Sequence, residues 1–508
     1  MSNASLVVEA ASPEARVVLR PSSDTWLAGA YGLALLVCLS EWSLAVRAPL
    51  WNDETLSYWQ IAGGFNQIWA RSIQGNSFAA YPYILWLNKT LFGDTELVLR
   101  IPSMLAMLAA IYVFYRCARE MFDWDISVLA TILFTLPSRV VYAAIDVRPY
   151  AFALLLTNLA ILMFLRWRKT DKIGFAALFG ATAAGIFYFH YLFGSILLAF
   201  ALCYLLTRYS SLLSDLRQIG AALACFAIFI IPVWPQLRYM YQTRATHVFT
   251  ETPRWVSLLQ TLNPGTRQLL TLASALVLAA LAKRLLTPNR EMYAKLALCA
   301  PLALAPVLFL YVISVTTPVH IFIPRYLLEA APGMALCWGW ICSLIDSRPL
   351  RGLFCFVFVG LCVFGAYSSP AARVHGFSWK YALEYADANA AEDHASLLMC
   401  SPFVEGDTQR MPAVASESML YAPLSYYKVS APVVPLPGSL VEESKRQARQ
   451  FLLKAAQEHR RFLVLAAGPS LPTVDFLSYY SNSTHVPRVL GNFDHIWVVE
   501  FVPYSAAR

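Results

Sequence analysis

The stretch Trp51-Asn52-Asp53-Glu54-Thr55-Leu56-Ser57-Tyr58-Trp59 places two adjacent carboxylates directly after the first long apolar run of the chain. A charge inside a bilayer costs about 2.5–3.5 kcal/mol on insertion scales, so acidic side chains kept at a membrane edge usually face a cavity, a substrate or an ion path. A plain solvated loop is the alternative, because the ends of membrane helices are often polar. Asp53 and Glu54 are therefore the first candidates for a functional site.

The composition around this stretch is that of a polytopic membrane protein, since 58% of the 508 residues are hydrophobic and only 14% are charged. Apolar runs of about 15–21 residues predict about eleven membrane-spanning helices. They lie at Trp26–Val46, Leu97–Cys117, Ile126–Ile145, Tyr150–Leu165, Ile173–Tyr188, Leu192–Leu206, Gly220–Trp234, Leu269–Leu281, Leu296–Val315, Tyr326–Ile345 and Leu353–Tyr367. Several are short for a hydrocarbon core of about 30 Å, notably Leu269–Leu281.

Lysine and arginine predict the orientation, because short cytoplasmic connections accumulate them. With the amino terminus inside, every cytoplasmic connection is basic, and the outer connections hold fewer basic residues for their length. The cytoplasmic set is Arg116, Arg119, Arg166, Arg168, Lys169, Lys172, Arg208, Arg217, Lys283, Arg284, Arg290, Lys295, Arg348 and Arg351. The net charge of +8 therefore reports topology rather than nucleic-acid binding.

The chain divides into two predicted parts. Residues 1–367 form the membrane domain, in which the first 25 residues are a cytoplasmic tail and residues 47–96 are a large outer loop. Within that loop Tyr81–Phe92 is apolar but too short to span, and is expected to be an interfacial or re-entrant helix.

Residues 368–508 are more polar and predict a soluble α/β domain outside the membrane. We expect strands at Ser396–Cys400, Phe462–Ala466 and Ile496–Phe501 and an amphipathic helix at Val441–His459.

Polar residues from separate outer connections fall on the same side of the membrane as the opening stretch. A binding site needs acids, cations and aromatics from several helices, so this shared side carries more weight than any one residue. Besides Asp53 and Glu54, the set is Asp146, Arg148, Tyr150, His190, Tyr191, Arg325 and Tyr326. The alternatives are a simple ion pair for Asp146 and Arg148, a satisfied interfacial residue for His190, and belt aromatics such as Tyr58.

Several of these segments resemble the membrane glycosyltransferases of the GT-C class. The likeness is to bacterial relatives of protein O-mannosyltransferases and of lipid A aminoarabinose transferases, and it covers roughly residues 26–350. It rests on the Trp51–Trp59 loop, Leu91–Ser103, Asp146-Val147-Arg148-Pro149-Tyr150, His190-Tyr191 and Pro324-Arg325-Tyr326-Leu327-Leu328. Many relatives carry a His-Pro-Pro element where this chain has Tyr81-Pro82-Tyr83, so no metal site is carried over, and a divalent metal requirement stays open.

The resemblance implies transfer of a sugar from a polyprenyl-phosphate carrier to a lipid, glycan or protein acceptor on the extracytoplasmic face of a bacterial inner membrane. A sugar phosphate already carries a leaving group, so the enzyme needs one carboxylate to take the acceptor proton and cations to stabilise the departing phosphate. We expect Asp53 to be the base of an inverting reaction. Glu54 or Asp146 would position the base or the acceptor.

The remaining residues are expected to bind substrate. Arg148, His190 and Arg325 are candidate phosphate partners. The aromatic candidates are Tyr58, Tyr150, Tyr191 and Tyr326.

Two other classes of protein remain as alternatives. A transporter or flippase of lipid-linked sugars would also hold polar residues among many spans, although such sites usually lie near the membrane midplane. A receptor or scaffold would leave the adjacent acids unexplained.

Overall fold

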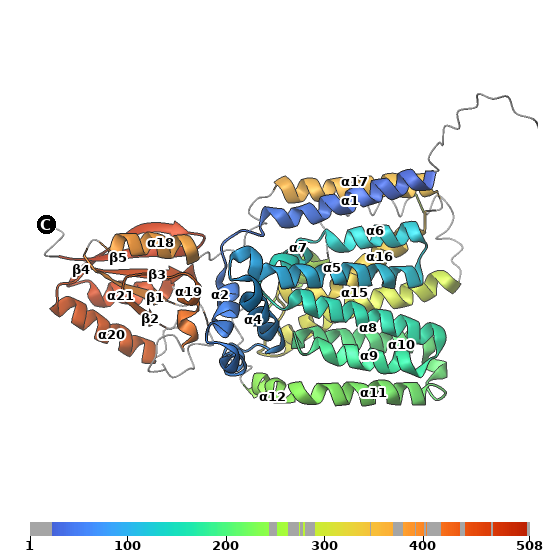
Figure 1. Cartoon of the computed structure of the whole chain (residues 1–508), viewed down its shortest axis with the longest axis horizontal. Coiled ribbons are helices and arrows are strands. Elements are labelled where there is room, and N and C mark those ends of the chain that lie inside the picture. Colours follow the sequence, from blue (N-terminus) through green and yellow to red (C-terminus); the bar gives the residue numbers. More distant parts are fainter. Residues whose placement is uncertain are drawn as a thin grey trace, which may run out of the picture.

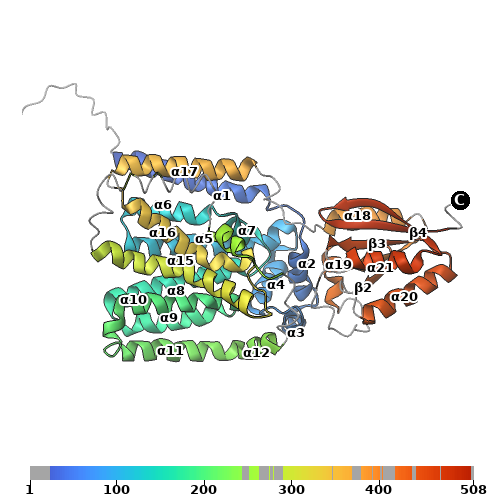
Figure 2. The same cartoon turned by 180° about the vertical axis from the view of Figure 1, so that it is seen from behind.

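In the computed structural model, long helices run side by side and a separate sheet domain lies beyond one end of them (Figures 1 and 2). The residues described are 23–242, 251–262, 274, 278–279, 290–345, 347–368, 379–391, 393–400, 403, 418–436, 442–468 and 471–504. Both views place the short helices α2 and α4 between the bundle and the sheet domain. The acidic stretch therefore lies where the two parts of the molecule meet.

The bundle is built of long apolar helices joined by short turns. Its elements are α1 (Ser23–Ser40), η1 (Glu41–Leu44), α5 (Glu96–Met121), α6 (Trp124–Thr135), α7 (Ser138–Ile145), α8 (Tyr150–Thr170), α9 (Ile173–Ile186), η3 (Tyr191–Ser195), α10 (Ile196–Arg208), α11 (Leu216–Ile230), α12 (Trp234–Gln242), α13 (Trp255–Leu262), α15 (Arg290–Thr316), η7 (Pro324–Ala330), α16 (Ala331–Ser343) and α17 (Arg348–Ser368).

Ten of the eleven predicted spans overlap helices of this bundle. Leu269–Leu281 lies almost entirely outside the residues that the structure describes, as do most of the predicted cytoplasmic tail and residues 369–378. Among the described residues, five helices are long and apolar enough to cross a membrane, or six if the bent pair α6 and α7 is one span. The fold is thus a helical membrane bundle, and eleven spans stay a prediction.

The bend between α6 and α7 helps to shape the end of the bundle that faces the sheet domain. The two helices meet at 71°, and Pro137 lies at the break. Proline lacks the backbone N–H that a continuing helix would use, so the chain turns there. The second helix then ends at Ile145, and the turn that carries Asp146 and Arg148 follows.

Three short helices cover the end of the bundle that faces the sheet domain. They are α2 (Asn52–Ala62), α3 (Ile68–Gln74) and α4 (Ala80–Phe92). The last corresponds to the short apolar segment expected at Tyr81–Phe92, and Asn88 fixes it to the bundle by donating to the carbonyl of Val98 at 2.8 Å.

The sheet domain has a five-stranded sheet of order β2-β1-β3-β5-β4. Its strands are β1 (Ser396–Cys400), β2 (Val433–Leu436), β3 (Phe462–Ala467), β4 (His485–Phe493) and β5 (Ile496–Pro503), and its helices are α18 (Trp379–Ala390), α19 (Ala422–Tyr426), α20 (Glu442–Gln457) and α21 (Leu471–Ser481). Strands β2, β1 and β3 are parallel, and β5 and β4 continue antiparallel.

Apolar clusters cover both faces of this sheet. Leu397 and Met399 pack with α18 on one face. Leu398 and Cys400 pack with α20 and α21 on the other. Burial on both faces explains why the central strands read as continuous apolar runs, and the expected strands at β1, β3 and β5 and the helix at α20 are confirmed.

Candidate functional site

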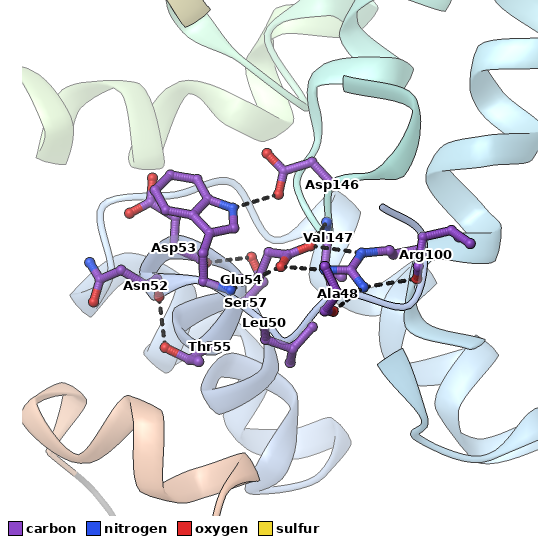
Figure 3. Close-up of polar contacts among 12 residues, drawn as sticks. Ala48, Leu50, Asn52, Asp53, Glu54, Thr55, Ser57, Arg100, Asp146 and Val147 are labelled. Carbon is purple, nitrogen blue, oxygen red and sulfur yellow. Dashed lines mark hydrogen bonds and ion pairs between the residues drawn. The ribbon is translucent and has the colours of Figure 1, made fainter. Parts of the chain in front are cut away.

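The site begins at the first turn of α2. Trp51 precedes the helix with an extended backbone, and the Glu54 carboxylate accepts its N–H at 3.1 Å. Thr55 donates its hydroxyl to the carbonyl of Asn52 at 2.7 Å. Carboxylates in a first turn also interact favourably with the helix dipole. Adjacent acids therefore start this helix, and the side chain of Glu54 points toward Arg100 and Val147 whereas that of Asp53 does not (Figure 3).

The carboxylate of Glu54 is buried and holds four parts of the chain together. Only 1% of its side chain is exposed, and it pairs with Arg100 of α5 at 2.7 Å. It also accepts the backbone N–H of Val147 at 2.9 Å. Arg100 in turn donates to the carbonyls of Val46 and Ala48 at 2.9 and 2.7 Å. Through Arg100, Glu54 thus joins the segment after η1 and α5 to the start of α2, and it also joins the turn after α7.

Asp53 contacts a residue that lies far from it in the sequence of the membrane domain. Its Oδ2 lies 3.0 Å from Nη1 of Arg325 in η7, and the two side chains are 17% and 30% exposed. The guanidinium of Arg325 also lies 5.8 Å from the ring of Trp51. The acid predicted as the base is therefore paired with a predicted phosphate-binding arginine, and both side chains are partly exposed.

Asp146 is more buried than Asp53. Its Oδ1 accepts from the indole Nε1 of Trp51 at 3.0 Å. Burial raises the pKa of Asp146 to about 6, and the negative charge of Asp53 adds to the rise. Asp146 is thus a carboxyl group that gains its proton in mildly acidic solution and that fixes the indole beside Asp53.

Arg148 lies next to both acids without a direct ion pair. Its Nη1 donates to the Asp53 carbonyl and to the Ser57 hydroxyl, both at 3.3 Å. Among the described residues no carboxylate oxygen lies within 4.0 Å of this guanidinium, and its buried Nε has no acceptor. Burial and the positive charge of Arg325 lower the pKa of Arg148. The nearby Tyr150, Asp53 and Asp146 outweigh these effects and keep the pKa above its usual range. Arg325 pairs with Asp53, while Arg148 beside it has no carboxylate within 4.0 Å among the described residues, and this arrangement favours an anion.

His190 completes the cluster through aromatic contacts. Its ring lies 5.3 Å from that of Tyr150 and 5.2 Å from that of Tyr326, and it stacks on Tyr191 at 6.0 Å. Burial lowers the pKa of His190 to about 3, and the charges of Arg148 and Arg325 add to the effect. The imidazole is therefore neutral, so it can offer a phosphate a hydrogen bond but no positive charge.

Tyr58 contacts a different set of residues. Its hydroxyl donates to Asp94 at 2.8 Å, its ring faces the ammonium of Lys89 at 4.5 Å, and it meets Tyr426 of α19 edge-on at 4.9 Å. Its substrate-binding role stays a prediction, and these contacts place it in the seam with the sheet domain.

Sequence reasoning assigned no site role to Arg100, Ser195 or Glu329. Ser195 of η3 donates its hydroxyl to the buried Glu329 of η7, which joins the elements that carry His190 and Arg325. The sequence did indicate a role for Glu329, because an ionisable residue inside an apolar helix needs a partner. The chain pattern did not say which partner.

The described residues contain no group of three histidine, cysteine, aspartate or glutamate side chains arranged to hold a metal ion. The hydroxyl of Tyr81 lies 3.4 Å from that of Ser103. The site thus contains the three acidic side chains of Asp53, Glu54 and Asp146, two guanidinium groups, a neutral imidazole and tyrosines.

Comparisons with known proteins agree with the resemblance seen in the sequence. A family model described as dolichyl-phosphate-mannose-protein mannosyltransferase matches residues 79–235. That range includes Asp146, Arg148 and His190 but neither Asp53 nor Arg325. No curated protein sequence matches the chain.

Solved structures share the fold. The crystal structure of ArnT from Cupriavidus metallidurans bound to undecaprenyl phosphate has a TM-score of 0.59 at 12% identity, over 94% of this chain and 98% of that one. Its apo form has a TM-score of 0.58, also at 12% identity and with the same coverage. The archaeal oligosaccharyltransferase AglB from Archaeoglobus fulgidus, in complex with an inhibitory peptide and a dolichol-phosphate, has a TM-score of 0.48 at 11% identity, over 90% of this chain and 71% of that one. The GT-C resemblance is confirmed, in the fold by ArnT and in sequence by the family model.

Proposed function

We propose that this protein is a membrane glycosyltransferase that moves a sugar from a polyprenyl-phosphate carrier to an acceptor at the α2 end of the bundle. The observation that carries the proposal is the pair of neighbouring guanidinium groups beside Asp53: Arg325 pairs with the acid, and Arg148 has no carboxylate within 4.0 Å among the described residues. A phosphate diester is the anion that this arrangement fits, because arginine offers a planar set of donors to phosphate oxygens.

The two guanidinium groups would stabilise the charge that develops on the leaving phosphate. The bond between the anomeric carbon and the phosphate oxygen breaks, and its electron pair leaves with the polyprenyl phosphate. When the phosphate engages Arg325, the contact between that guanidinium and Asp53 has a competitor. The Asp53 carboxylate is then available for the acceptor.

Asp53 is our candidate for the general base. Its carboxylate would take the proton of the acceptor hydroxyl while the acceptor oxygen bonds to the anomeric carbon from the face opposite the phosphate, so that the configuration inverts. We assign positioning to Glu54 and Asp146, because the first is saturated by Arg100 and backbone donors and the second is bonded to Trp51. His190 would donate a hydrogen bond to the phosphate, and Tyr150, Tyr191 and Tyr326 would surround the substrate.

We also propose a location and an orientation in the membrane for the protein. We propose residues 1–367 as the membrane part and 368–508 as an extracytoplasmic domain of a bacterial inner-membrane protein, with the amino terminus in the cytoplasm. A lipid, glycan or protein acceptor would then be reached from outside. A transporter of lipid-linked sugars is less well supported, since the charged cluster lies at one end of the helices (Figure 1) and transport sites usually lie near the midplane.

The test uses the purified full-length protein in liposomes that contain polyprenyl-phosphate donors with labelled sugars. Acceptors come from membranes of a deletion strain, after mass analysis of its surface glycans and lipids has identified the missing product. We expect label to move to the acceptor and free polyprenyl phosphate to appear in equal amount. Movement of intact donor between leaflets without cleavage would instead identify a transporter.

A further inference from the structure

We infer that the sheet domain is a positioning element of the site: Tyr427 and Trp379 hold the residues on either side of Trp51 and so fix the carboxylate of Asp53. The inference rests on the proposed transferase function and gives the sheet domain a part in it. Strongest among its supports are two hydrogen bonds that cross from the sheet domain to the three residues before Asp53.

The first of these bonds fixes the backbone. The hydroxyl of Tyr427 accepts the N–H of Leu50 at 2.6 Å. Leu50 is fully buried, so without this partner its amide would lie among apolar groups. Leaving a buried donor unpaired is unfavourable, so the bond specifies where this part of the chain lies.

The second bond fixes the first residue of α2. The indole Nε1 of Trp379 donates to Oδ1 of Asn52 at 3.2 Å. Trp379 is fully buried in the apolar cluster that α18 forms with strands β1, β3 and β5, together with residues such as Leu397 and Val498. The indole therefore transmits the position of the sheet to the residue next to Asp53.

Apolar contacts hold the rest of α2 against the same domain. Leu56 and Trp59 form a buried cluster with Phe403, Met419 and Ala422. Figures 1 and 2 both show α19 beside α2. The first turn of α2 is thus fastened on one side to the sheet domain, while the guanidinium group that meets Asp53 belongs to the bundle.

The consequence concerns the distance between Asp53 and the two guanidinium groups. These bonds connect the sheet domain to the residues beside Asp53, whereas Arg148 and Arg325 are fixed by α7, α8 and η7. Misplacement of a reacting group by about 1 Å can cost about a hundredfold in rate. Loosening the contacts from the sheet domain should therefore lower turnover without removing any group that touches the carrier phosphate.

A structural test needs no activity. Hydrogen–deuterium exchange is measured on the full-length protein in wild-type, Tyr427→Phe and Trp379→Phe forms. We expect the Leu50 amide to exchange roughly tenfold faster in Tyr427→Phe, because an open amide loses the protection of its hydrogen bond. Trp379→Phe should accelerate exchange in the first turn of α2. Unchanged exchange of this segment in both variants would overturn the inference.

A kinetic test separates positioning from general stability. Tyr427→Phe should lower kcat for sugar transfer by roughly tenfold to a hundredfold and leave KM for the donor unchanged. The melting midpoint should fall no further than the loss of one hydrogen bond to the Leu50 amide explains. In an Asp53→Asn background the same substitution should have no further effect, because the group that it positions is already inactive. The control is Tyr479→Phe, since this tyrosine of α21 is 72% exposed.

The outcomes of the two inferences can be told apart. If the wild-type protein transfers no sugar, the proposed function fails and the exchange measurement still decides whether the contacts hold the segment. If the wild-type protein is active and Tyr427→Phe and Trp379→Phe both keep its kcat, positioning by the sheet domain is wrong and the transferase proposal stands. An equal loss in the Asp53→Asn background would also contradict positioning through Asp53.

Discussion

Replacing Glu54 by alanine should destabilise the protein by about 3–5 kcal/mol, the usual loss when one partner of a buried ion pair is removed. The structure explains why the upper part of that range is expected. The substitution leaves Arg100 with a side chain only 4% exposed and no carboxylate partner. It also leaves the backbone N–H groups of Trp51 and Val147 without their acceptor. Each unpaired buried donor adds about 1–3 kcal/mol, although these terms are not additive.

Glu54→Gln tests whether that loss comes from hydrogen bonding or from chemistry. Glutamine keeps one acceptor oxygen, so it should retain part of the hydrogen bonding and lie between alanine and the wild type. The assay is the thermal midpoint of the purified protein, read together with its transfer rate. The control is Glu120→Gln at the other end of the bundle. The pairs of Glu120 with Arg166 and Lys169 are partly exposed, and each should contribute about 0–1 kcal/mol.

The reasoning predicts that stability and activity fall together across the Glu54 series. A Glu54→Gln protein that is as stable as the wild type but inactive would refute it. Glu54 would then return to the reaction itself as a second catalytic carboxylate. An alanine variant with an unchanged midpoint would show that the contacts with Arg100 contribute little.

Three further predictions follow from the site and the topology. Arg148→Gln and Arg325→Gln should each weaken binding of undecaprenyl phosphate about tenfold or more, because hydrogen bonds to charged groups contribute about 1.5–3 kcal/mol. Titration calorimetry measures this loss of affinity. The pKa of Asp146 is about 6 in the folded protein and about 3.9 when unfolded. The thermal midpoint of the wild type should therefore fall as pH rises from about 4 to 6 and level off above that range. In Asp146→Asn this dependence on pH should disappear. Reporter fusions after Lys169 and after Ser369 should lie inside and outside, respectively.

Each of these predictions has a matched control and a contrary outcome. Arg116→Gln removes an exposed cation from the other end of the bundle, and it should leave carrier binding unchanged. Unchanged affinity in both Arg148→Gln and Arg325→Gln would remove the two arginines from the phosphate site. A midpoint profile that is identical in wild type and Asp146→Asn would contradict the raised pKa, and a cytoplasmic signal after Ser369 would overturn the orientation.

Much of the bundle could be predicted because apolar length alone identifies a helix in a membrane. The same rule cannot find a bend, so the predicted span Ile126–Ile145 is two helices separated at Pro137. In the sheet domain the buried central strands are visible as apolar runs. β2 and β4 are not, because the first is only four residues long and the second holds Pro487 and an irregularity between Val489 and Gly491.

The sequence predicted which residues form the candidate site, but not which of them contact one another. The predicted topology places Asp53, Asp146, Arg148 and Arg325 on one side of the membrane, and the structure brings them together at one end of the bundle. Which acid pairs with which cation depends on packing between residues hundreds of positions apart, as in the contact between Asp53 and Arg325. The fastening of α2 by the sheet domain is of the same kind. Its two hydrogen bonds join residues more than 300 positions apart, and no local sequence pattern predicts them.

The turnover of Asp53→Asn shows whether the Asp53 carboxylate is the general base. Asparagine keeps the shape of the side chain and an oxygen that can accept from Arg325, but it has no basicity. Single-turnover transfer from a polyprenyl-phosphate sugar should fall about 10²–10⁴-fold, with donor binding intact. Asp494→Asn, at an exposed turn of the sheet domain with a φ of 48°, should keep the wild-type rate. Near-normal transfer by Asp53→Asn would contradict the account.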